Sequence, residues 1–215
     1  MEIYETEEEQ VAAIKSWWKE NSKATILGLG LGIAVILAWN YWQSYKKDQA
    51  EQAAGLYSEL LKADAANNKD TVVKLAERIG TQFHGTDYSA YSGLLEAKVK
   101  ALQGDLAGAK QILEGIAAKS DKELSNIAKI RLVRLMLANK EYEQGLKLIN
   151  DIDPATSASF SGHYDELVGD LYVALDRLDQ ARTSYQNALR SGYQSPLLQM
   201  KIDDLTMPPR IESKK

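Results

Sequence analysis

The chain has 215 residues, of which 45% are hydrophobic and 26% are charged, and its formal net charge is −4. This balance is ordinary for a folded protein, and an acidic chain lacks the basic surface that nucleic acid requires, so no nucleic-acid partner is expected. Because there is no cysteine, disulfides and thiolate metal sites are excluded.

The first 23 residues predict a tail that contains a short amphipathic helix. Thr6 and Glu9 have the spacing of a capping box, the pair of side chains that closes a helix N-terminus. An apolar stripe at helical spacing follows, made of Val11, Ile14 and Trp18. Such a helix is suited to lie in a membrane interface. Asn21 and Ser22 are expected to break it, with Ser22 capping the next helix; the alternative is a flexible acidic leader.

Residues 24–45 predict a membrane-spanning helix. They contain no charged residue, and a helix of this length extends about 33 Å, against roughly 30 Å for the hydrocarbon core of a bilayer. Aromatic residues flank the span, as they do at membrane interfaces: Trp17, Trp18, Trp39, Tyr41, Trp42 and Tyr45. A cleaved signal peptide has a basic leader, a shorter apolar run and small residues at its cleavage site. We therefore expect an uncleaved anchor in the lipid bilayer, rather than a signal peptide or a buried core helix.

Within the span, Ala24, Gly28 and Gly32 recur every four residues and share one face of the helix. Small residues at this spacing allow another membrane helix to approach closely, which predicts a docking stripe. The alternative is that glycine is simply common in membrane helices, and the partner, if there is one, is either another copy or a different protein. Lysines flank both ends in similar number, so charge alone does not decide the orientation.

Beyond the span the apolar residues keep helical spacing, which predicts a helical stalk over residues 46–66. From residue 67 to 206, helices separated by short loops repeat with a constant step of 36 residues. The aligned positions are Leu106, Tyr142 and Leu178, then Ala109, Gly145 and Ala181, then Leu113, Ile149 and Tyr185. Residues 50–83 predict a further, weaker helix pair, Pro196 begins a closing helix, and residues 207–215 are expected to be a flexible tail.

The third copy, with "LVGDLY" followed by Ala181, Tyr185 and Ala188, resembles the tetratricopeptide (TPR) pattern of helix–turn–helix units. The step of 36 rather than 34, and Gly145 where alanine is usual, are departures from that pattern. We therefore expect an all-α chain, with a single transmembrane helix followed by a TPR-like solenoid. The alternative is an unrelated helical bundle.

In such a solenoid the first helix of each pair lines a concave face. Placing the pattern on the chain gives twelve candidate binding residues: Tyr91, Leu94, Lys98, Leu102, Ile127, Ile130, Arg134, Leu137, His163, Glu166, Asp170 and Val173. This largely apolar face suits an unfolded segment or a partner's helix. A register error of one residue would move some of these side chains into the core.

Catalytic and cofactor motifs are missing. His84 and His163 belong to no metal-binding string, and no phosphate loop, nucleophile elbow or dinucleotide fingerprint occurs, so no metal, no cofactor and no enzymatic activity are expected. The neighbouring acids at 165–166 and 203–204 point apart on their helices and are interpreted as solvated surface.

The opening "MEIYETEEEQVAAIKSWWKEN", the glycine-striped span, the exit "NYWQSYK" and the TPR-like array together resemble the YfgM-type ancillary subunits of the bacterial Sec translocon. The resemblance implies an inner-membrane protein with residues 1–23 in the cytoplasm and residues 67–206 in the periplasm. It also implies association with SecYEG and with the membrane-anchored chaperone PpiD, and a role in handing translocating polypeptides to periplasmic chaperones. The competing hypothesis is a membrane-tethered regulatory adaptor of an envelope stress response that acts through its cytoplasmic tail.

Overall fold

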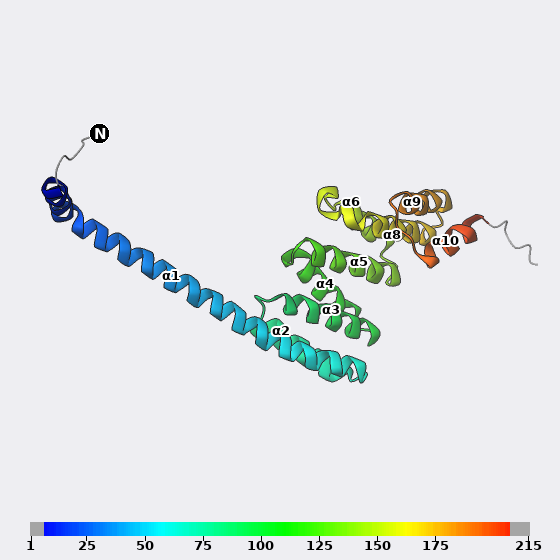
Figure 1. The fold of residues 1–215 in the computed structure, drawn as a ribbon. Coiled ribbons are helices and arrows are strands. Elements are labelled where there is room, and N and C mark those ends of the chain that lie inside the picture. The colour runs from blue at the N-terminus through cyan, green and yellow to red at the C-terminus, as the bar shows by residue number, and fades with distance from the viewer. Residues whose placement is uncertain (1–6, 207–215) are drawn as a thin grey trace, which may run out of the picture. The chain divides into compact units, whose positions relative to one another are not determined.

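A computed structural model describes residues 7–206 (Figure 1). Helices and short turns make up this range, which contains no strand, so the predicted all-α class is confirmed. In chain order the elements are α1 (Glu7–Ala65), α2 (Lys69–Gln82), α3 (Asp87–Leu102), α4 (Leu106–Lys119), α5 (Lys122–Ala138), α6 (Tyr142–Asn150), α7 (Pro154–Ser157), η1 (Ala158–Phe160), α8 (Ser161–Ala174), α9 (Leu178–Arg190) and α10 (Pro196–Thr206). Thr6 of the expected capping box and the expected tail at 207–215 lie outside the described residues.

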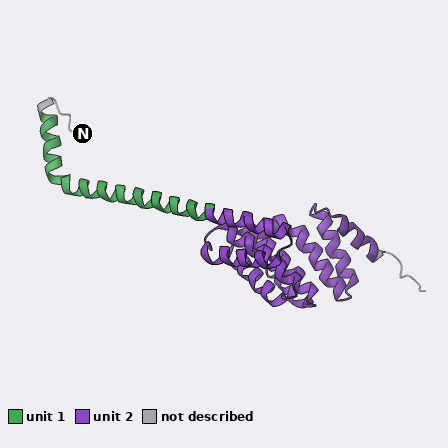
Figure 2. Cartoon of the chain, turned by 90° about the horizontal axis from the view of Figure 1, so that it is seen from below, with its two compact units in different colours: residues 1–51 green, residues 52–215 purple. Residues whose placement is uncertain are grey.

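Helix α1 is continuous, so the break expected at Asn21 and Ser22 is wrong and Ser22 caps no helix. The side-chain amide of Asn21 donates to the carbonyl of Trp17 at 3.0 Å, and the Thr25 hydroxyl donates to the carbonyl of Asn21 at 2.9 Å. Bonds of this kind satisfy polar side chains on the preceding turn and bend a helix without ending it. Accordingly, α1 bends within residues 7–51 but does not stop (Figure 2).

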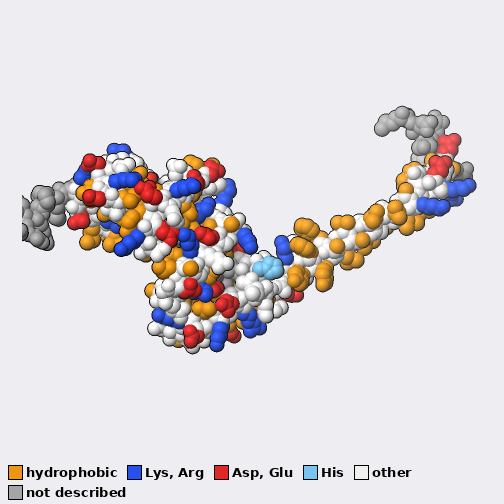
Figure 3. Space-filling view, turned by 180° about the vertical axis from the view of Figure 1, so that it is seen from behind, with side chains coloured by type: hydrophobic (Ala, Val, Ile, Leu, Met, Phe, Trp, Pro, Cys, Tyr) orange, Lys and Arg blue, Asp and Glu red, His pale blue; other side chains and the backbone are white. Residues whose placement is uncertain are grey.

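The predicted span lies entirely in α1. From Ile26 to Asp48 every side chain is exposed, and apolar side chains line this part of the helix (Figure 3). The helix is long and apolar enough to cross a membrane. Because it is apolar on all sides and nothing in the described chain covers it, lipid or another protein must remove this surface from water.

A separate compact unit begins at Gln52, inside α1, rather than at residue 67 (Figure 2). Leu60 and Ala63 of α1 are buried in one apolar cluster with Val72 and Ile79 of α2. The last turns of α1 therefore form the first helix of a packed pair, as expected for residues 50–83, and only the part before Gln52 lies outside the helical domain.

The remaining pairs are α3 with α4, α5 with α6, and α8 with α9, each packed on its neighbours in chain order. Their second helices α4, α6 and α9 begin at the three aligned positions of the 36-residue repeat. The turn before each holds one residue with a positive φ, namely Gly104 at 88°, Lys140 at 61° and Asp176 at 58°. The following residue donates its backbone N–H to the carbonyl five positions earlier, at 2.8–2.9 Å. This is the Schellman closure, repeated once per unit.

The recurring small residues lie where helices cross closely. Ala109 and Ala181 are fully buried, and a Cβ built on Gly145 would come within 3.1 Å of Leu171 Cδ2. A Cβ on Gly169 would come within 2.2 Å of the Tyr185 ring. The 36-residue pattern of small residues therefore reflects packing between helices.

The second unit is irregular, since α6 is short and α7 and η1 follow it. Asn126 of α5 holds this insertion in place. Its amide donates to the carbonyls of Lys122 at 2.7 Å and Thr156 at 3.0 Å, and its oxygen accepts from the Tyr164 hydroxyl at 2.7 Å. One buried amide thus links α5, α7 and α8, with its polar atoms satisfied.

Candidate functional site

The expected docking stripe is open on α1. Ala24, Gly28 and Gly32 are exposed, and a Cβ added at either glycine would meet no atom within 4 Å. Packing within the chain therefore gives no reason for glycine at these positions. The stripe leaves the helix backbone accessible to another helix, which is the geometry that close membrane-helix contacts use.

In α3 the expected concave-face residues divide between surface and core. Tyr91 is 39% exposed and Leu102 is 65% exposed, and the exposed Lys98 pairs with Asp64 of α1 at 3.1 Å. Leu94 is only 6% exposed and packs in the core with α4 and α5. Its expected surface position is wrong, because α3 contacts helices on both sides and buries a wider arc than a simple two-faced pattern assumes.

The same division occurs in α5. Arg134 is exposed, and Ile127 and Leu137 are half-buried. Ile130 is 6% exposed and lies in a cluster with Tyr164 of α8, so its expected surface position is also wrong. The reason is again that the first helix of one pair packs on the next pair along the stack.

In α8, side chains from later in the same chain contact the residues expected to bind a partner. The amine of Lys201 on α10 donates to Glu166 and Asp170, each at 2.8 Å. The Tyr193 hydroxyl also donates to Glu166, at 3.0 Å, and the Tyr185 hydroxyl to Asp170, at 2.8 Å. Burial acts to lower the pKa of Lys201, but the bonds to the two carboxylates outweigh it and raise that pKa. Glu166 is therefore part of an internal network, not a free surface acid.

The remaining α8 candidates are His163 and Val173. The His163 ring lies 4.4 Å from the Tyr193 ring and 6.1 Å from the Phe160 ring, between centroids. Val173 is 41% exposed. Asp165 is half-buried and burial raises its pKa, so the solvated surface expected at 165–166 is wrong for both acids.

A cluster of tyrosines is the main feature that the sequence reasoning missed. Tyr57 of α1 lies 5.6 Å from Tyr88 and 6.1 Å from Tyr91 of α3, and those two rings are 6.2 Å apart, between centroids. The three-residue spacing of Tyr88 and Tyr91 signalled a shared helix face. Tyr57 lies on a different helix, and residue spacing does not predict its contact with α3.

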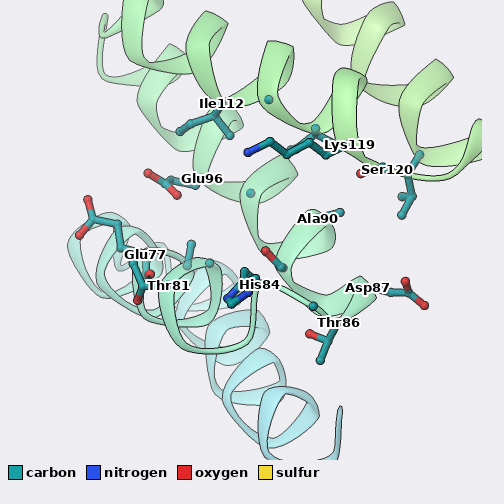
Figure 4. Close-up of a pocket in the computed structure, with 18 of the residues that line it drawn as sticks. Glu77, Thr81, His84, Thr86, Asp87, Ala90, Glu96, Ile112, Lys119 and Ser120 are labelled. Carbon is teal, nitrogen blue, oxygen red and sulfur yellow. Dashed lines mark hydrogen bonds between the residues drawn. The ribbon is translucent and has the colours of Figure 1, made fainter. Parts of the chain in front are cut away.

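A cleft of about 660 Å³ lies between α2, α3 and α4 (Figure 4). Short residues such as Gly80, Gly93 and Gly115 line it and leave the space open. Glu77 and Glu96 lie on one side of the cleft, and Glu96 is only 8% exposed. Burial raises the pKa of Glu96. The positive charge of Lys100, whose Nζ lies 4.0 Å from Glu96 Oε1, offsets part of that rise. Over the range that the structure describes, no group of His, Asp and Glu side chains could hold a metal ion.

Comparison with known proteins bears on the whole chain. The family model described as a tetratricopeptide repeat-like domain matches residues 15–207. An ancillary SecYEG translocon subunit of Escherichia coli (strain K12) is 29% identical over 211 residues, which cover 96% of this chain and 100% of the relative. One of Haemophilus influenzae is 27% identical, covering 93% of this chain and 97% of the relative. One of Neisseria gonorrhoeae is 24% identical with the same coverage.

No solved structure matches the chain. The family model, in contrast, covers far more than half of the residues, including part of the apolar helix and all of the repeated helix pairs. The chain therefore belongs to the tetratricopeptide repeat-like domain family, and the relatives it resembles over nearly their whole length are ancillary SecYEG translocon subunits.

Proposed function

We propose that this chain is a non-enzymatic ancillary subunit of the bacterial Sec translocon. One observation carries the proposal: the Escherichia coli relative aligns over its full length with 96% of this chain, so the aligned region takes in both the apolar helix and the repeat domain of this chain. The exposed, apolar part of α1 supports anchoring in the inner membrane. In this proposal the N-terminal tail is cytoplasmic and the helical domain is periplasmic.

The helical domain acts as a scaffold in this proposal. It associates with a PpiD-like membrane-anchored chaperone and assists the hand-over of translocated polypeptides. A domain tethered by one helix is held at the translocon exit at a raised effective concentration, so weak and reversible contacts suffice there. The open face of α3 supports this role because the exposed side chains of Tyr91 and Leu102 offer aromatic and apolar surface that the described chain leaves uncovered.

The docking stripe offers a test of translocon association with a matched control. Gly28 and Gly32 lie on one face of α1, whereas Gly30 lies on the opposite face at the helical rotation of about 100° per residue. We expect Gly28→Leu together with Gly32→Leu to reduce co-purification with SecYEG from membranes by about tenfold, and Gly30→Leu to leave it unchanged. Photocrosslinkers at 28 and 32, but not at 30, are expected to trap a translocon subunit. Equal trapping from all three positions would contradict the stripe.

The regulatory adaptor is separated by a deletion. In the proposed function the tail docks at the translocon together with the span, so removing residues 2–20 is expected to weaken co-purification with SecYEG. An altered stress response with normal translocon association would instead favour a signalling role for the tail. Measuring both readouts in one strain distinguishes the two functions.

A further inference from the structure

The tyrosine cluster of Tyr57, Tyr88 and Tyr91 lies where the end of α1 meets α3. The rings of Tyr88 and Tyr91 meet edge to face at 78°, and Tyr91 is 39% exposed while the other two are half-buried. Each ring is thus fixed by its neighbours and still open on one side. Rigid, partly exposed aromatic side chains bind apolar or aromatic side chains at little entropic cost.

Two arginines of α5 come next to these rings. The guanidinium of Arg131 donates to the carbonyl of Leu94 at 3.0 Å, which fixes its position on α3. Burial around this guanidinium lowers the pKa of Arg131, the positive charge of Arg134 lowers it further, and Tyr57 partly offsets both. Arg131 of α5 thus reaches α3, which carries Tyr88 and Tyr91, and the exposed Arg134 lies three residues further along α5 on the same side of the helix.

These two cations lack a counter-ion in the part of the chain that the structure describes. No carboxylate forms an ion pair with Arg131 or Arg134 there. Asp64 is paired with Lys98 at 3.1 Å, and Glu166 and Asp170 share the single cation Lys201. Paired like charges with no acid of their own favour an external anion.

A second group of rings belongs to α8 and the segments that adjoin it. Tyr193 packs on His163 with ring centroids 4.4 Å apart, and Phe160 lies 6.1 Å from His163. Helix α5 packs on α3 on one side and on α8 on the other, and the Tyr193 hydroxyl donates to Glu166 of α8 at 3.0 Å. Burial and Glu166 raise the pKa of Tyr193, and the charge of Arg134 offsets part of that rise. In the order of these helices the groups are therefore rings, two arginines, rings.

We propose that this face binds an extended polypeptide segment that carries a carboxylate side chain between large apolar or aromatic residues. The carboxylate is held by Arg131 and Arg134, because guanidinium groups match the planar geometry of a carboxylate and bind it through two hydrogen bonds. The flanking residues pack on the tyrosine cluster at one end and on Tyr193 and His163 at the other. The inference rests on the proposed function, because a translocating or chaperone-held segment is such a ligand.

The test uses the full-length protein in detergent and two short fluorescent peptides. Both consist of alternating leucine, tyrosine and serine, with a central glutamate in one and a central lysine in the other. We expect the glutamate peptide to bind at least about tenfold more tightly than the lysine peptide by fluorescence anisotropy. This preference is expected to weaken as salt is raised, because the ionic contact is partly exposed.

Variants of the site assign the preference to its residues. Arg134 is exposed and forms no ion pair in the described chain, so Arg134→Gln is expected to remove most of the preference, and Arg134→Glu to reverse it. Tyr91→Ala is expected to weaken the binding of both peptides equally and to leave the preference for the glutamate peptide unchanged. Arg190→Gln, at the exposed end of α9, is the matched control and is expected to bind as the unchanged protein does.

Two outcomes would overturn the proposal. One is equal binding of the two peptides by the unchanged protein, and the other is a preference that survives Arg134→Glu. A peptide that becomes helical on binding, seen by circular dichroism, would overturn the extended form of the ligand in favour of a helical partner. Co-purification with SecYEG is measured on the same variants, so a failure of peptide selectivity is distinguished from a failure of translocon association.

Discussion

Replacing Gly169 with alanine is expected to destabilise the helical domain, whereas the same replacement at Gly115 is expected to stabilise it. Gly169 lies inside α8 and faces the ring of Tyr185, where a new Cβ would stand 2.2 Å from Cε1. Gly115 lies inside α4, with no atom within 4 Å of the new Cβ. Both substitutions gain the same helix propensity, about 0.5–1 kcal/mol, so the difference between them reports the helix crossing.

Tyr185 has little room to move away. It is 2% exposed, and its hydroxyl donates to Asp170 at 2.8 Å. Overpacking a buried site costs about 1–3 kcal/mol, and a hydrogen bond to a charged group contributes about 1.5–3 kcal/mol that a shifted ring would partly lose. After the gain in helix propensity, Gly169→Ala is expected to lower the free energy of unfolding by about 1–4 kcal/mol. Gly115→Ala is expected to raise it by about 0.5–1 kcal/mol.

The assay is urea unfolding of the full-length protein in detergent, followed by far-ultraviolet circular dichroism. Detergent keeps the apolar helix folded and gives a constant baseline, so the transition reports the helical domain. Tryptophan emission is uninformative for this purpose because all four tryptophans lie at or before position 42. A midpoint for Gly169→Ala equal to or above that of the unchanged protein would refute the close crossing of α8 and α9.

Three further predictions follow from buried polar groups. Lys201→Met leaves two carboxylates of α8 without their cation and is expected to cost about 2–4 kcal/mol, measured by the same urea transition, with Lys201→Arg as the milder control. Burial raises the pKa of both Tyr164 and Tyr185, so their contribution to stability is complete below about pH 10 and is lost as the pH rises above it. A urea midpoint that is the same at about pH 9 and about pH 11 would contradict this. Asn126→Leu removes the partner of the Tyr164 hydroxyl and the bond to the Thr156 carbonyl, and it is expected to lower the free energy of unfolding by about 2–3 kcal/mol. It is also expected to speed proteolytic cleavage near α7, which mass spectrometry of the fragments locates.

The repeat could be predicted from the sequence because its signals are local. A small residue, a large apolar residue and a helix start recur together, and each depends on contacts within one helix pair. Leu106, Tyr142 and Leu178 therefore open α4, α6 and α9 as the alignment requires. The apolar helix was predictable for the same reason, since an uncharged stretch long enough to span a bilayer is a property of consecutive residues.

Side-chain exposure on the concave face could not be predicted in this way. Leu94 and Ile130 share helix faces with exposed neighbours, and they become buried only because α3 and α5 also pack on the next pair. The continuity of α1 through Asn21 is a similar case, since a polar residue that often ends helices here bonds to the preceding turn. Both outcomes depend on partners that residue spacing does not specify.

The role of α10 shows how a terminal helix shapes the surface of a solenoid. A repeat stack needs a cap at its end, and α10 provides it by burying Leu198 on α9. The same helix delivers Lys201 to Glu166 and Asp170, two acids of α8. This lysine offsets one of their two negative charges and ties α10 to α8. Capping of the stack and the charge on this side of α8 are therefore linked, because the helix that buries Leu198 also carries Lys201.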